Sequence, residues 1–412
     1  MPVDFEPEPR AAEIAARLSS FIRNVVIPIE EAEGSSLHGA PETFRHELQE
    51  AARQAGVFAP HVPQRWGGLG LDMRGQAIVF EEAGYSLFGP LAINGSAPDE
   101  ANMHLLDVVA NEKQQSEYLA PLAAGEIRSC FAMTEPAPGA GSDPDMLSTH
   151  AARVDNGWRI DGRKWFITGA RGAKLIICMA RTSGVPGGGD TDGATMFLID
   201  ADNPGVEVVR EITTLDEGLF GGHCELAFDN CIVGDEAVLG EVDRGFQYAR
   251  VRLEPARLTH CMRWLGLARR ARDIAVDRAA SREIFGSRLA ELGMVQQMLA
   301  DTEIDLAAAR GLIWHAAWKL DRGERAAQET SIAKTFVAEA VGRVIDRSVQ
   351  ICGALGISGD IPLSRYLREV RPFRIYDGPS EVHRWSIARR VVRQATSSAS
   401  SSSAAASSAA SG

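Results

Sequence analysis

The spacing of apolar residues along the chain changes twice. From about position 11 to 122, apolar residues recur every three or four positions, as they do on one face of a helix. Between about 129 and 241 they alternate with polar residues, which is typical of strands with one buried face. After about 243 the helical spacing returns and continues to about 393. This order predicts an α+β protein with N-terminal helices, a central β-domain and C-terminal helices.

The two helical regions give two specific expectations. A first helix should bury one apolar face, made by Ile14, Leu18, Phe21, Ile22 and Val25. A later helix should bury a second apolar stripe, made by Ile304, Ala308, Leu312, His315 and Trp318.

Turn signals divide the β region. Asn156-Gly157 and Asp161-Gly162 are dipeptides that favour tight turns. The segment 223–232 alternates, with Cys224, Leu226 and Phe228 on one face. We expect a small antiparallel barrel or sandwich, and we expect the glycine-rich segment 184–193 to be a hairpin loop, because no Lys-Ser/Thr pair of a phosphate-binding loop follows it.

These patterns predict domain boundaries. We place an N-terminal helical domain at 1–128, the β-domain at 129–241 and the C-terminal helical bundle at 242–395. Residues 396–412 are only Thr, Ser, Ala and Gly, which cannot bury a core, so this tail is predicted to be disordered.

Composition excludes several classes of protein. The net charge of −12 argues against a nucleic-acid-binding surface, which needs clustered Lys and Arg. The six cysteines form no CxxC pair and no His cluster has metal-ligand spacing, so we expect buried free thiols and no metal site. No window has the roughly 20 apolar residues of a membrane span. The acidic, Pro-rich start resembles no targeting signal, and we expect a cytoplasmic protein.

Five short segments carry a family resemblance. They are FAMTEP at 131–136 with GSD at 141–143, KWFITG at 164–169, SREIFG at 281–286, QICGALG at 350–356, and RIYDGP at 374–379 with EVHR at 381–384. In this order they resemble motifs of the acyl-CoA dehydrogenase family along nearly the whole chain to Arg393. The resemblance implies a central β-barrel or sandwich, a C-terminal four-helix bundle, FAD as cofactor and an acyl-CoA as substrate. It further implies an electron-transfer flavoprotein or a similar electron acceptor.

The resemblance also assigns residues to the cofactor. The flavin ring would contact Phe131, Met133, Thr134, Phe166 and Thr168, with Phe166 standing where the family usually has Trp. The adenosine half of FAD would contact Arg282, Phe285, Gln350 and Gly353. In the family the Gln-Gly segment reaches the FAD of a neighbouring subunit, which implies a homodimer or homotetramer. The alternatives are a core position for Phe166 and a solvated helix charge for Arg282.

Asp377 is the predicted catalytic base. The family usually has Glu in Tyr-Glu-Gly-Thr, and this chain has Tyr376-Asp377-Gly378-Pro379. An Asp base occurs in a branch often joined to a phosphotransferase-like domain, and Gly221-Gly222-His223 also resembles that branch. Other members carry the base just before the arginine that Arg257 matches, but that position is Ala256 here.

The base should take the α-proton of the thioester, and its backbone N–H should polarise the carbonyl. We expect burial in an apolar pocket to raise the pKa of Asp377 towards neutrality. The alternative is that Asp377 is only a turn residue in an Asp-Gly pair. By resemblance, substrate-binding residues are Ser142, Arg257, Gly378 and Arg384. The alternatives are a local turn or cap for Ser142 and a helix-surface charge for Arg257.

Some features depart from the family and leave rival functions open. Residues 137–140 make the loop after the TEP segment two residues longer, Gly293 replaces a helical Gln, and Pro379 replaces Thr. One rival is an oxygen-using oxidase or monooxygenase of the same fold, including a nitroalkane oxidase with an Asp base. Another is a non-catalytic binding relative, against which the carboxylate and the net charge weigh.

Overall fold

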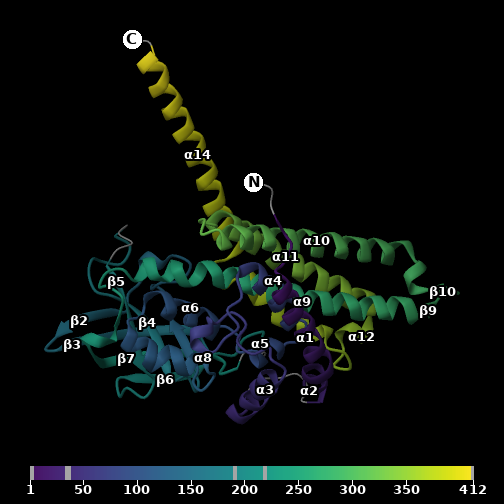
Figure 1. Cartoon of the computed structure of the whole chain (residues 1–412), viewed down its shortest axis with the longest axis horizontal. Coiled ribbons are helices and arrows are strands. Elements are labelled where there is room, and N and C mark those ends of the chain that lie inside the picture. Colours follow the sequence, from purple (N-terminus) through teal and green to yellow (C-terminus); the bar gives the residue numbers. More distant parts are fainter. Residues whose placement is uncertain (1–3, 33–38, 189–192, 217–219, 410–412) are drawn as a thin grey trace.

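The computed structural model describes residues 4–32, 39–188, 193–216 and 220–409, with 397–409 described by their backbone alone. Helices come first along the chain, then a sheet, then long helices (Figure 1). The N-terminal helices are α1 (Pro9–Phe21), α2 (Ile27–Ala32), α3 (Glu42–Gln54), α4 (Met73–Ala83), α5 (Gly89–Ala92), α6 (Asp99–Val109), α7 (Glu112–Gln114) and α8 (Ala120–Ala123).

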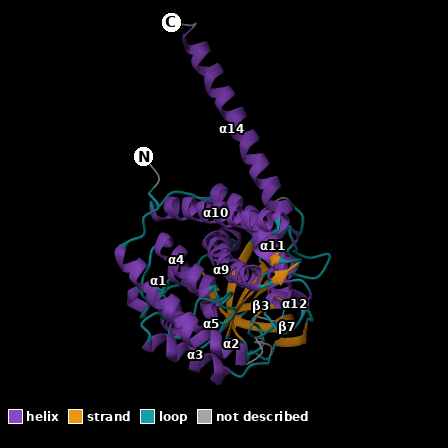
Figure 2. Cartoon of the chain, turned by 90° about the vertical axis from the view of Figure 1, so that its right-hand side faces the viewer, coloured by secondary structure: helices purple, strands orange, loops and turns teal. Residues whose placement is uncertain are grey.

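The sheet follows directly. Its strands are β1 (Ser129–Ala132), β2 (His150–Val154), β3 (Gly157–Thr168), β4 (Leu175–Arg181), β5 (Ala194–Asp200), β6 (Val206–Glu211), β7 (His223–Gly234) and β8 (Val238–Leu239). The last part of the chain holds α9 (Gly245–Ser281), the hairpin β9 (Glu283–Ile284) and β10 (Ser287–Arg288), then α10 (Gly293–Asp321), α11 (Ala327–Cys352), α12 (Ala354–Ile357), α13 (Leu363–Val370) and α14 (Ser380–Ala409). Figure 2 shows helices of both ends around the strands, with α11 above them and α12 to their right.

The eight-stranded sheet has the order β6-β7-β3-β2-β4-β5-β8, and β1 pairs in parallel with β4. The other pairings are antiparallel except that of β2 with β4, so the expectation of an antiparallel barrel or sandwich was wrong for the two parallel pairings of β4. The turn at Asn156-Gly157 is confirmed between β2 and β3. Asp161-Gly162 is instead a bulge inside β3, where the register with β7 slips, and the Asp161 carboxylate accepts a hydrogen bond from the N–H of Asn230. The segment 184–193 connects the antiparallel strands β4 and β5, as predicted, although residues 189–192 lie outside the described part.

Strand β4 separates two hydrophobic cores. Its residues alternate in direction, so Leu175, Ile177 and Met179 belong to the core shared with the helices, whereas Ile176 and Cys178 belong to the core inside the sheet. Burial on both faces explains why this strand reads as an unbroken apolar run. The alternation of Cys224, Leu226 and Phe228 in β7 is confirmed, because all three face the inner core.

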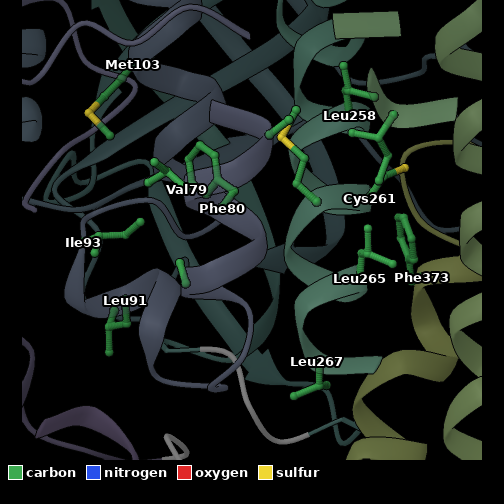
Figure 3. Packing of buried hydrophobic residues seen from close by; sticks show 14 of the residues in the cluster. Val79, Phe80, Leu91, Ile93, Met103, Leu258, Cys261, Leu265, Leu267 and Phe373 are labelled. Atoms are coloured by element: carbon green, nitrogen blue, oxygen red, sulfur yellow. The ribbon is translucent and has the colours of Figure 1, made fainter. Parts of the chain in front are cut away.

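The larger core joins the two helical regions. Val79 and Phe80 of α4 lie on one side of α9, whereas Leu258 and Leu265 of α9 lie on its other side, towards Phe373 (Figure 3). This core contains residues from all three predicted domains, so it does not divide the chain into units. The boundaries at 128/129 and 241/242 therefore remain a prediction.

The two predicted helix faces fared differently. Of the first face, Ile14, Leu18, Phe21 and Ile22 are buried, as predicted, whereas Val25 is half-buried and Val26 is buried in its place. In α10 the predicted stripe was wrong, because Ile304 is 65% exposed while Leu306 and Ile313 are buried. Both faces of α10 carry apolar residues, so spacing alone could not select the inner one.

Helix α14 begins beside the body and then projects away from it in both views (Figures 1 and 2). Its backbone is helical to Ala409, where the sequence predicted a disordered tail. Alanine has the highest helix propensity, and neither Gly nor Pro interrupts residues 396–409.

Candidate active site

The segment Tyr376-Asp377-Gly378 forms a strained turn at the start of α14. Asp377 has φ +53° and Gly378 has φ +96°, and only glycine adopts such values without cost. A side chain at position 378 would also press against His383, with its Cβ 2.9 Å from Nε2 of that ring. Aspartate tolerates the left-handed region in turns better than most residues, so the contacts that hold this turn tell more about its role than the backbone angle does.

Three helices hold the backbone of this turn. Arg257 Nε of α9 donates to the Asp377 carbonyl at 2.9 Å, and Nε2 of His383 in α14 lies 3.2 Å from the same oxygen. Lys334 Nζ of α11, a side chain with no exposed surface, donates to the Gly378 carbonyl at 2.7 Å. The predicted neighbourhood of Arg257, Asp377 and Gly378 is thus present in the structure.

The carboxylate of Asp377 is largely buried and surrounded by cations. Its Oδ2 lies 3.2 Å from Nε2 of His260, and the side chain is 17% exposed. Burial by itself raises the pKa of Asp377, but the contact with His260 and the charges of Arg252 and Arg257 outweigh it and hold the pKa below its ordinary value. The prediction of a pKa raised towards neutrality was therefore wrong, because the pocket around this carboxylate is cationic and not apolar.

Phe166 offers a wall for a planar ligand. It lies in β3 with φ +50° and 46% of its surface exposed, although its neighbours Trp165 and Ile167 are more buried. The N–H of Trp165 donates to the Thr134 carbonyl at 3.0 Å, so the TEP and WFIT segments lie side by side. An exposed aromatic ring on a strained backbone, next to the half-buried Met133 and Thr134, fits an isoalloxazine ring stacked against it. The alternative core position for Phe166 does not fit its exposure.

Thr168 lies in the same region and belongs to a polar chain. Its Oγ1 is 2.9 Å from Nδ1 of His223, and Nε2 of that ring is 3.2 Å from Asp216 Oδ2. A hydroxyl group can donate to one partner and accept from another, so this contact is compatible with the predicted hydrogen bond to the flavin.

Glu135 of the TEP segment forms a buried ion pair with Lys164. Lys164 Nζ is 2.8 Å from Glu135 Oε1, and neither side chain has more than 1% exposure. Burial opposes ionisation of Glu135, but the charge of Lys164 and its hydrogen bond lower the pKa of Glu135 to about 2. The carboxylate also accepts hydrogen bonds from the N–H groups of Ala140, Ser148 and Thr149. Glu135 therefore fixes the loop of residues 137–140, which the sequence singled out as a departure from the family.

The predicted adenosine-binding residues lie elsewhere. Arg282, Gln350 and Gly353 are exposed, and Phe285 is 91% exposed with φ +52°. The hairpin β9–β10, which carries Phe285, lies at the opposite end of the molecule from strands β2 and β3 (Figure 1). One chain therefore does not bring these residues to Phe166.

Three other predicted residues have distinct surroundings. Ser142 is exposed in the loop between β1 and β2. Arg384 forms two hydrogen bonds with Glu339 at 2.6 and 2.8 Å, so its guanidinium is engaged by α11. Phe131 lies under the guanidinium of Arg252, whose carbon is 4.2 Å from the ring centroid.

The sequence reasoning missed His260, although a signal was present. Arg252, Ala256, His260 and Arg263 recur at four- and three-residue spacing and so share one face of α9. His260 lies one helical turn after Ala256, the alternative base position, and the motifs assign it no role. His383 stood inside a quoted motif but received no role.

The family models that match this chain all describe one family. Family models described as the N-terminal, middle and C-terminal domains of acyl-CoA dehydrogenase match residues 8–126, 130–231 and 243–392. The chain belongs to the acyl-CoA dehydrogenase family, and it is an FAD-dependent oxidoreductase.

Individual relatives agree along most of the chain. A probable acyl-CoA dehydrogenase FadE2 of Mycobacterium tuberculosis is 37% identical, covering 94% of this chain and 96% of the relative. Acyl-CoA dehydrogenase family member 11 of Gallus gallus is 35% identical over 92% of this chain, which spans 50% of that relative's length. The structure of a putative acyl-CoA dehydrogenase from Mycobacterium abscessus superposes with a TM-score of 0.88 at 34% identity, covering 94% of this chain and 99% of that one.

The described ranges contain neither a metal-binding cluster nor a membrane-spanning helix. Nowhere in them do three or more His, Cys, Asp or Glu side chains gather as they would around a metal ion. Among the helices of these ranges, none combines the length and apolar character that a bilayer crossing requires. The six cysteines are buried and unpaired.

Proposed function

We propose that the protein removes two hydrogens from an acyl-CoA thioester to form the 2-enoyl-CoA, with Asp377 as the base. The observation that carries this proposal is an ionised, largely buried carboxylate in a strained turn that three helices fix in place. A turn residue with no other role would not need the buried carboxylate and its cationic surroundings, whereas the positive φ is common in Asp-Gly turns.

The carboxylate of Asp377 accepts the α-proton, and the Cα–H bond electrons form the new double bond. FAD bound against Phe166 would supply the acceptor for the β-hydride. Because the pKa of Asp377 is low, the carboxylate is ionised throughout the neutral range but is a weak base. The α-proton must therefore be acidified by hydrogen bonds to the thioester carbonyl, for which the N–H of Asp377 is the donor of this chain.

A second copy of the chain would complete the cofactor site. Arg282, Phe285, Gln350 and Gly353 are exposed, and the hairpin β9–β10 that carries Phe285 lies at the opposite end of the molecule from β2 and β3 (Figure 1). In a homodimer or homotetramer these residues would bind the adenosine half of the FAD whose flavin ring rests on the partner's β-domain. An electron-transfer flavoprotein or a similar acceptor would then reoxidise the flavin.

The test is an anaerobic screen of CoA thioesters that vary in length, branching and hydroxylation. Loss of the oxidised flavin absorbance by at least one thioester, with an enoyl-CoA as the product, is the expected result. Reoxidation in air measures the rival function: fast turnover with oxygen in place of an electron-transfer protein would identify an oxidase. Absence of flavin reduction by every thioester, although FAD is bound, would overturn the proposal.

A further inference from the structure

A line of polar contacts leads from Asp377 into the interior. Asp377 Oδ2 is 3.2 Å from His260 Nε2, and His260 Nδ1 is 3.1 Å from Arg263 Nη2. Arg263 Nη1 donates to the Gly95 carbonyl at 2.7 Å and lies 3.4 Å from Glu100 Oε2. Glu100 Oε2 also accepts from Thr259 Oγ1 at 3.0 Å. Glu100 and Arg263 are buried and His260 is 12% exposed, so water does not compete strongly for these groups.

This arrangement determines which nitrogen of His260 carries the proton. An arginine can only donate hydrogen bonds, so Nδ1 of His260 must be the acceptor. Burial lowers the pKa of His260, and the charge of Arg263 acts in the same direction, so the ring is neutral. The one ring proton is therefore on Nε2, which lies 3.2 Å from Asp377 Oδ2. The two groups are not aligned for a hydrogen bond, and Oδ2 is buried without a hydrogen-bond partner among the described residues, so the N–H acts on the carboxylate by electrostatic attraction.

We propose that His260 is a positioning residue for the base: its Nε2–H orients the Asp377 carboxylate, and Arg263 together with Glu100 fixes the orientation of the ring. The proposal deepens the proposed function and rests on it. The α-proton stays on Asp377, because Nδ1 of His260 is already engaged by Arg263 and the ring has no free acceptor.

Other charged groups face the same turn but act on its backbone or from further away. Those near Asp377 are Arg252 and Arg257 of α9, Lys334 of α11 and His383 of α14. Arg257 and Lys334 donate to the carbonyls of the turn, and Arg252 Nε donates to Asn102 at 2.7 Å. Within the described residues, His260 is the one cationic or imidazole side chain within ion-pair distance of the carboxylate oxygens.

His260 could instead serve only to fill space. Its ring centroid is 4.9 Å from that of Tyr376 and 6.0 Å from that of Phe373, so it packs among aromatic rings. The test must therefore separate loss of packing from loss of the Nε2–H. His260→Leu removes both the ring and the donor, whereas His260→Gln keeps an amide N–H near the position of Nε2. His315→Leu on α10 is the matched exchange away from the site.

The first measurement needs no substrate. Thermal unfolding of the FAD-loaded protein is followed for wild type, His260→Leu, Asp377→Asn and the double variant. A direct contact makes the effects overlap, so that adding His260→Leu to Asp377→Asn lowers the melting temperature less than adding it to wild type. Fully additive losses would overturn the inference, whatever the substrate of the enzyme.

The second measurement is the rate of flavin reduction by a thioester found in the screen. We expect His260→Leu to lower the rate constant about tenfold to a hundredfold, the scale on which a misplaced reacting group slows catalysis, with little change in thioester affinity. His260→Gln should recover most of the rate, and His315→Leu should match wild type. Equal losses in the Leu and Gln variants, or a loss confined to thioester affinity, would show a packing role only. If no thioester reduces wild type, the proposed function fails, while the unfolding measurement still decides whether the contact exists.

Discussion

The region around Asp377 and the region around Arg282 and Phe285 differ in how many contacts a single chain supplies to each. Around Asp377, side chains from α9, α11 and α14 converge on a single turn, and the carboxylate is 17% exposed. Around Arg282 and Phe285, the side chains point into solvent, and Phe285 is 91% exposed. One chain therefore builds the surroundings of the proposed base by itself, whereas the predicted adenosine-binding residues remain exposed.

The largest expected effect is on the completed end. Asp377→Asn keeps the size of the side chain but cannot accept the α-proton, so the rate of flavin reduction should fall by about two to four orders of magnitude. Thioester affinity should change little, and Asp377→Glu should retain measurable activity as the family's usual base. Rapid mixing under anaerobic conditions measures all three. Near-normal reduction by Asp377→Asn would point to Glu254, whose Oε1 is buried without a hydrogen-bond partner among the described residues.

The second largest effect is expected at the ion pair of Lys164 and Glu135, which fixes the loop of residues 137–140. Lys164→Met leaves the Glu135 carboxylate buried without its cation, which should lower the free energy of unfolding by about 3–5 kcal/mol. Adding Glu135→Gln to this variant should recover part of the loss, because no unpaired charge then remains. Chemical denaturation of the FAD-loaded protein measures both. A loss below about 1 kcal/mol would mean that water reaches the pair in solution.

The third effect tests the open end. Arg282→Ala should weaken FAD binding about tenfold to a hundredfold, the range for a charge-assisted hydrogen bond to phosphate, without changing helicity. Arg288→Ala, an exposed arginine in the same hairpin, is the control. In mixed oligomers of Arg282→Ala and Asp377→Asn subunits, some sites should combine both intact residues and regain activity. If mixing restores nothing, the two ends do not share a cofactor site.

A smaller effect follows from the low pKa of Asp377. A base is active when deprotonated, and this carboxyl has a pKa below its ordinary value, so lowering the pH through neutrality does not protonate it. The rate of flavin reduction should therefore vary by less than about twofold down to about pH 5, one unit above the ordinary pKa of Asp. A base whose pKa is raised towards neutrality would instead lose activity between pH 8 and 6, about where such a group titrates. The pH dependence of the single-turnover rate distinguishes the two.

The smallest effect is expected at the C-terminus. Deleting residues 397–412 removes the part of α14 that projects from the body (Figures 1 and 2), together with residues 410–412 beyond the described part. Melting temperature, FAD content and activity should match the full chain, since the segment holds no large apolar side chain. A clear loss of stability would show that this segment docks against another copy.

Local properties of the chain were predictable without the structure. The change of apolar period at about 129 and 243 gave the order of helices and strands, because side-chain periodicity follows from backbone geometry. The motif segments predicted that the TEP and WFIT segments meet and that Arg257 lies near Asp377, and the hydrogen bonds of Trp165 to Thr134 and of Arg257 to Asp377 agree with both. Where a segment is apolar on more than one face, as in α10, the pattern did not reveal which face is buried.

Only the tertiary structure decided the electrostatics of the base. The sign of the pKa shift of Asp377 depends on the balance between burial, the contact with His260 and the charges of Arg252 and Arg257, and these three residues lie more than 100 positions earlier in the chain. The proton lies on His260 Nε2 because Arg263 donates to Nδ1. Arg263 is held in turn by the Gly95 carbonyl and by Glu100 of α6. Sequence motifs named the carboxylate, but the packing of helices that meet only on folding determines its protonation and its orientation.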